Sequence, residues 1–110
     1  MLKVNGKQLI MNAGDYGETV NFKLINGEIL ENDDITLIIE NKRTFSNIIE
    51  KKLDITGANE FEFTLTEEET ALLDVGTYLW GILWERDGEL VDTLEVDNFF
   101  TVERGLANAD

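Results

Sequence analysis

The protein has 110 residues, of which 23 are acidic and 9 basic, and its formal net charge at pH 7 is −14. It contains no Cys and no His, which excludes disulfides, Ser-His or Cys-His nucleophile pairs and tetrahedral zinc sites. The charge opposes binding to phosphate backbones and to anionic membranes, and no apolar run approaches the ~20 residues of a membrane-spanning helix. We therefore expect no cofactor, no metal, no nucleic-acid partner and no membrane partner.

The first half of the chain alternates short strand-like segments with turn signals. The expected strands cover residues 8–12, 18–25 and 35–40. In the second of these strands, Val20, Phe22 and Leu24 alternate with polar residues, so we expect them to face the core. The third strand is rich in β-branched residues and apolar enough to be central in its sheet. Residues 45–53 are compatible with either an edge strand or a short helix.

After an expected loop over residues 56–59, the chain alternates strictly and then changes period. Over residues 60–65, the apolar side chains Phe61, Phe63 and Leu65 recur at every second position, which predicts a strand with these side chains in the core. The next four residues form a capping box, in which Thr66 and Glu69 satisfy each other's backbone amides at a helix start. We expect a helix of about two turns.

A long closing hairpin follows, with strands over residues 76–85 and 90–103 and a turn at Asp87-Gly88. Four large side chains share one face of the first strand, and we assign this face to the core. They are Tyr78, Trp80, Ile82 and Trp84. On the return strand, Asp97-Asn98 interrupts the apolar pattern and predicts a β-bulge.

These elements predict an all-β, Ig-like antiparallel β-sandwich of about seven strands, with one short helix before the penultimate strand. We expect residues 1–103 to form a single domain, because no linker or internal repeat divides them. Residues 104–110 are small and polar, and we expect a flexible C-terminal tail there.

The second half of the chain also carries a longer pattern of core and turn residues. Its parts are Thr66-Glu67-Glu68-Glu69 with Leu72-Leu73, Gly76-Thr77-Tyr78-Leu79-Trp80, Asp87-Gly88, Thr93-Leu94 and Phe100-Thr101-Val102-Glu103. This pattern resembles the Ig-like domains of tailed-phage structural proteins. It is similar to the N-terminal domain of phage baseplate upper proteins, and the resemblance covers roughly residues 10–103.

The resemblance implies a non-enzymatic phage or prophage structural protein that mediates protein–protein assembly. Its partners would be other virion proteins or a second copy of itself, and its location the virion, assembled in the bacterial host cytoplasm. In such a protein the docking surface is either an edge strand or an exposed apolar stripe. The candidate residues of the stripe are Leu79, Leu83, Trp84 and Phe99.

Two other functions are compatible with the sequence. Trp84 lies near the hairpin turn, where its ring could stack on a sugar in a carbohydrate-binding or adhesion module. The strong negative charge could instead mimic DNA and inhibit a host DNA-binding defence protein.

Acidic clusters are the remaining candidates for chemistry. The run Glu31-Asn32-Asp33-Asp34 could offer oxygen ligands to Ca²⁺, but it lacks the spacing of an EF-hand loop, and a solvated loop is favoured. The carboxylates of Glu60 and Glu62 and of residues 67–69 fit a polar strand face and a helix start better than a glycosidase pair. We therefore expect no catalytic residue.

Overall fold

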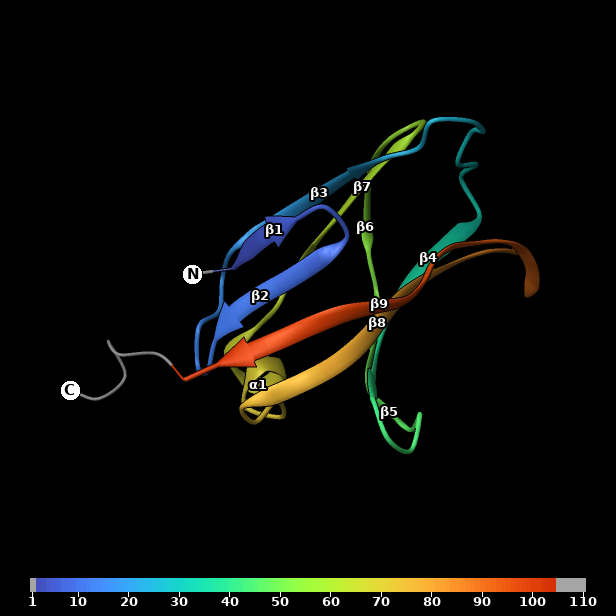
Figure 1. Cartoon of the computed structure of the whole chain (residues 1–110). Coiled ribbons are helices and arrows are strands. Elements are labelled where there is room, and N and C mark those ends of the chain that lie inside the picture. Colours follow the sequence, from blue (N-terminus) through green and yellow to red (C-terminus); the bar gives the residue numbers. More distant parts are fainter. Residues whose placement is uncertain (1, 105–110) are drawn as a thin grey trace.

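The computed structural model describes residues 2–104, and within them it contains nine strands and one short helix (Figure 1). The strands are β1 (Lys3–Asn5), β2 (Gln8–Asn12), β3 (Thr19–Lys23), β4 (Asp33–Asn41), β5 (Asn47–Lys52), β6 (Asp54–Gly57), β7 (Glu60–Thr64), β8 (Gly76–Arg86) and β9 (Glu89–Glu103). The helix is α1 (Glu67–Thr70), which precedes the penultimate strand. The expected all-β fold with one short helix at this place is confirmed, with nine strands in place of about seven.

The strands form two sheets. The larger sheet has the order β1-β2-β9-β8-β4-β5, and the smaller one has the order β3-β7-β6. Neighbouring strands are antiparallel, except that β2 and β9 run parallel. The expected antiparallel sandwich therefore contains one parallel pair, β2 with β9. A parallel pair needs a crossover connection, and here the chain between β2 and β9 supplies it.

The core lies between the two sheets and is built from the alternating positions of the facing strands. Phe61, Phe63 and Leu65 are buried as the strict alternation predicts. The aromatic face of β8 also points inward, since Trp80 and Trp84 are buried together with Ile82. The strands β7 and β8 form because their apolar side chains recur at every second residue, so that each strand buries a row of them against the other sheet.

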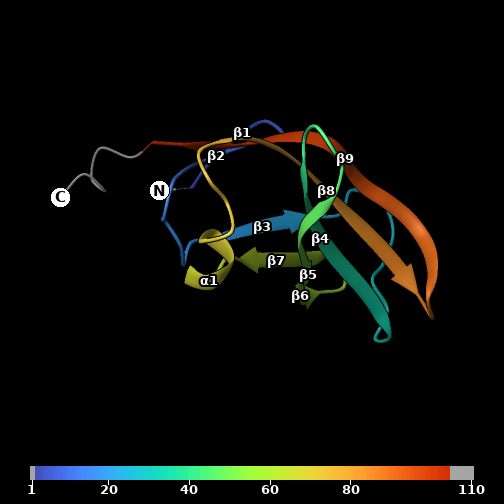
Figure 2. The same ribbon diagram turned by 90° about the horizontal axis from the view of Figure 1, so that it is seen from below.

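The helix α1 carries the chain from β7 in the small sheet to β8 in the large one (Figure 2). Its capping box is confirmed: Thr66 Oγ1 accepts from the amide of Glu69, and a Glu69 carboxylate oxygen accepts from the amide of Thr66. The helix has a single turn, so the expected length of two turns is wrong. The amide of Leu73 donates to the carbonyl of Thr70, three residues earlier, and the tightened chain places Leu73 in the core.

Two other expectations change in the middle of the chain. Residues 45–53, which were compatible with a strand or a helix, contain the edge strand β5. Part of the expected loop at 56–59 belongs to the strand β6, whose four residues are all exposed and so give no hydrophobic alternation. Of the expected C-terminal tail, residues 105–110 lie outside the described residues.

Candidate protein-interaction site

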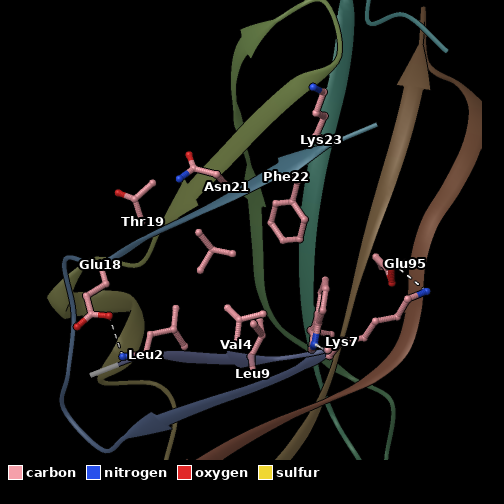
Figure 3. A pocket seen from close by; sticks show the side chains of 13 residues that line it. Leu2, Val4, Lys7, Leu9, Glu18, Thr19, Asn21, Phe22, Lys23 and Glu95 are labelled. Atoms are coloured by element: carbon pink, nitrogen blue, oxygen red, sulfur yellow. Dashed lines mark hydrogen bonds and ion pairs between the residues drawn. The ribbon is translucent and has the colours of Figure 1, made fainter. Parts of the chain in front are cut away.

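A groove of about 520 Å³ lies between the β1–β2 hairpin, β3 and β9 (Figure 3). It forms where the small sheet ends at β3 and the large sheet ends at β1, so the two layers leave a space at this margin of the sandwich. Its apolar lining consists of Leu2, Val4, Leu9, Val20, Phe22 and Trp80.

Two aromatic side chains form the inner part of this groove. The ring of Phe22 is only partly buried and projects into the space from β3, as Figure 3 shows. It is stacked on Phe61 with ring centroids 5.1 Å apart and lies 6.0 Å from Trp80. The indole nitrogen of Trp80 donates to the carbonyl of Lys7, 3.0 Å away, and this bond fixes the β1–β2 turn against β8.

The rim of the groove is polar and carries both signs of charge. Lys7 Nζ lies 3.3 Å from a carboxylate oxygen of Glu95, and the other oxygen of Glu95 accepts from Asn98 Nδ2 at 2.9 Å. At the opposite end, Glu18 accepts a hydrogen bond from the amide of Leu2 at 2.9 Å. An apolar interior with a polar rim is typical of a protein-binding surface.

Next to the groove, a long part of β9 is an open sheet edge. Strand β2 pairs with β9 only from Leu9 opposite Phe100 to Asn12 opposite Glu103. Within residues 2–104, the segment Glu89–Asn98 therefore has β8 on one side and no strand on the other. In Figure 2 this β8–β9 hairpin, in orange, curves away from β3 and β7. We refer to Glu89–Asn98 as the β9 edge.

The β9 edge is irregular, as the sequence predicts for Asp97-Asn98. Asp97 has a positive φ of 53°, and the register with β8 shifts between Trp80 and Ile82 and at two later positions. Gly81 lies opposite this irregularity, where a Cβ atom would come within 2.7 Å of the carbonyl oxygen of Glu95. The bulge is confirmed, and it gives the hairpin extra twist.

The side chains of the β9 edge are a mixture of apolar and acidic groups. Leu90, Val91 and Val96 are 59%, 41% and 61% exposed. The exposed carboxylates of the edge are Glu89, Asp92 and Asp97, and among the described residues no basic side chain forms an ion pair with them.

The four residues proposed from sequence for protein contact fall into different environments. Leu79 lies on the outer face of the large sheet, opposite Phe99 of β9, and is buried. Leu83 is half-buried, and Trp84 is buried at 6% exposure. Phe99 is 47% exposed, and Lys42 Nζ lies 5.0 Å from the centre of its ring. Of the proposed stripe, Phe99 alone offers a large exposed surface.

Trp84 belongs to a buried polar cluster, which was not foreseen. Its indole nitrogen donates to Asp33 Oδ2 at 2.9 Å, and the Arg86 guanidinium lies 5.7 Å from the centre of its ring system. Trp84 is therefore held inside the protein, and its ring faces are not open for stacking on a sugar. Asp33 and Arg86 lie opposite each other at the ends of the adjacent antiparallel strands β4 and β8. A prediction of this strand pairing was the only route from the sequence to this cluster.

The same cluster also contains Asp33 of the acidic run at residues 31–34, so this carboxylate is bound within the protein. Asp33 accepts from Arg86 Nε and Nη2, from Trp84 Nε1 and from the amide of Leu30. The Arg86 hydrogen bonds hold the pKa of Asp33 far below its ordinary range, although burial alone raises it. No group of three or more His, Cys, Asp or Glu in residues 2–104 is arranged to hold a metal ion.

No protein-family model, no curated protein and no solved structure matches this chain. Within the described residues, no helix is long and apolar enough to span a bilayer.

Proposed function

We propose that this chain is a non-enzymatic assembly module of a tailed-phage or prophage particle, and that it binds a neighbouring protein through the β9 edge and the adjacent groove. The observation that carries the proposal is the outer side of Glu89–Asn98, which has no neighbouring strand among the described residues, while the inner side pairs with β8. Such an edge offers a row of amide and carbonyl groups that pairs readily with a strand of another chain.

The composition of this surface supports a selective contact. The bulge at Asp97 and the acidic side chains of the edge disfavour pairing between two flat, unrelated edges. At the same time, Leu90, Val91 and Val96 are exposed and supply apolar area for a fitting partner. The phage setting comes from the resemblance of the hairpin and helix pattern, and the non-enzymatic role from the lack of His and Cys.

The acidic inhibitor is a second candidate, because a net charge of −14 suits a DNA-binding protein as partner. Duplex DNA would compete with this chain for such a partner, whereas it would leave a contact between particle proteins unchanged. The carbohydrate-binding alternative has less support, since Trp84 and Trp80 are both buried.

The proposal is tested in particles from a host strain that produces this chain with an affinity tag. Gradient-purified particles are analysed by quantitative mass spectrometry before and after a wash at high salt. We expect the chain at a fixed copy number relative to the tail proteins. Its absence from purified particles would contradict the assembly role in the virion.

A further inference from the structure

We infer that the β9 edge takes up an extended, Lys- or Arg-containing segment of another protein, which joins the large sheet as an additional strand in line with β2. This inference rests on the proposed function, because it names the chemistry of the partner for the same surface. Its main support is the combination of an open backbone edge, an adjoining groove and an unbalanced charge.

The position of the added strand follows from the sheet order. Beyond the end of the β9 edge, from Phe100 to Glu103, the same side of β9 is occupied by β2. A segment that pairs along Glu89–Asn98 would lie on the same side of β9 as β2 does. It would occupy the part of that side that precedes the β1–β2 turn. The end of the segment that approaches this turn would reach the groove, since Lys7 and Glu95 both line it (Figure 3). An apolar side chain at that end would meet Phe22, whose ring is partly exposed there.

The charge of the partner follows from the composition of the edge. Residues 87–98 contain five carboxylates and no Lys or Arg. One of these carboxylates, Glu95, is paired with Lys7, whereas Glu89, Asp92 and Asp97 have no ion-pair partner among the described residues. Opposite charges on paired strands are stabilising, so a segment with basic side chains fits this edge.

A second copy of this chain is a poorer occupant. Pairing of two β9 edges would bring the carboxylates of one copy beside those of the other, and like charges on facing strands are destabilising. The partner is therefore a different protein segment.

The test uses the whole chain and a short capped peptide of alternating Lys and Val as the probe. Amide hydrogen exchange is measured by NMR with and without the peptide. We expect slower exchange in the β9 edge and no change in the opposite edge strand β5. A peptide of the same charge, with its backbone amides N-methylated at alternate residues, is the control for strand pairing. Equal binding of the methylated peptide would overturn the inference.

A pair of variants separates a local contact from general attraction to an acidic protein. Glu89→Lys with Asp92→Lys changes the β9 edge, while Glu50→Lys with Asp54→Lys makes the same change of charge on β5 and β6. We expect the first double variant to bind the peptide roughly 3- to 30-fold more weakly than the second. Equal loss in both would overturn the inference. So would a dimer of the free chain with a protected β9 edge, which would indicate a second copy as the occupant.

The two proposals fail in different ways. If the chain is present in purified particles but the peptide protects no amide of the β9 edge, the strand-addition inference is wrong and the assembly role stands. If the peptide pairs with the β9 edge but the chain is absent from particles, the virion role is wrong and the edge remains a binding site for basic segments.

Discussion

Arg86 holds the carboxylate of Asp33 with two hydrogen bonds, from Nε to Oδ1 at 2.7 Å and from Nη2 to Oδ2 at 2.8 Å. Asp33 begins β4 and Arg86 ends β8, so this pair joins the two strands beside the turn of the β8–β9 hairpin. The Asp33 side chain is fully buried, while Arg86 remains partly exposed. The pair therefore ties the turn end of the hairpin to the start of β4.

Stability should fall in acid because of Asp33. Its pKa in the folded protein is below the value of about 3.9 that is ordinary for aspartate in an unfolded chain. The stabilisation is therefore complete above this ordinary value and is lost as the pH falls below it. We expect Asp33→Asn to be less stable at pH 7 and to show a shallower loss of stability between pH 5 and 2, measured by urea unfolding. The exposed Asp54→Asn variant is the control, and equal slopes for Asp33→Asn and wild type would contradict this account.

Removal of the guanidinium should be more damaging than removal of a surface charge. Arg86→Ala leaves the buried Asp33 carboxylate without its main partner, whereas Lys52→Ala breaks only the exposed ion pair with Asp34. We expect a clearly larger decrease in Tm for Arg86→Ala. Arg86→Lys should recover only part of the loss, because an ammonium group cannot make the two parallel hydrogen bonds. Similar Tm values for the Ala variants would show that the buried pair contributes little.

Gly81 should tolerate no side chain. A Cβ atom there would lie 2.7 Å from the carbonyl oxygen of Glu95, so the bulged part of β9 would have to move. We expect Gly81→Ala to lower the free energy of unfolding by about 1–3 kcal/mol. Gly57→Ala is a matched control in β6, since its Cβ would meet no atom closer than 3.7 Å. Denaturant unfolding that ranks the two variants equally would contradict the close contact.

The contribution of the capping box to stability should be measurable with single substitutions. Thr66→Ala removes the acceptor for the amide of Glu69, and we expect a loss of about 1 kcal/mol. Glu68→Gln removes a first-turn charge without touching the box and should cost only a few tenths of that amount, by the helix-dipole effect. The free energies of unfolding of both variants are compared by denaturant unfolding. A larger loss for Glu68→Gln than for Thr66→Ala would show that the first-turn charge contributes more to stability than the cap.

The wall of the groove depends on one indole hydrogen bond. Trp80→Phe keeps an aromatic ring but leaves the carbonyl of Lys7 without its donor. We expect faster amide exchange in β1 and β2, measured by NMR, with the rest of the large sheet less affected. Trp84→Phe is the control, because it breaks the bond to Asp33 and should leave exchange in β1 and β2 unchanged.

Local patterns account for most of the fold. Strict alternation placed Phe61, Phe63 and Leu65 correctly, and the capping motif located the helix start. The turn at Asp87-Gly88 is also confirmed, and both residues have the positive φ that a two-residue hairpin turn of this type requires. Where no apolar side chain is buried, as in β6, the sequence carries no such signal and the strand was missed.

The candidate site could not be predicted in the same way. The β9 edge exists because β2 reaches only as far as Phe100, and the register of two strands distant in sequence leaves no local pattern. The cluster of Asp33, Trp84 and Arg86 likewise depends on the pairing of β4 with β8. The sequence pattern had placed Leu79 and Trp84 in an exposed stripe for protein contact. Both are buried, Trp84 in this cluster and Leu79 on the outer face of the large sheet.

The parallel pairing of β2 with β9 also affects how the chain folds. The large sheet is completed only when residues near the two ends of the chain meet, which requires closure of a loop that contains almost all other elements. During synthesis, β2 cannot join the large sheet until β9 has been made. The strands β3, β6 and β7 can pair with one another earlier. We therefore expect slow folding dominated by non-local contacts, with docking of the β1–β2 hairpin as a late step.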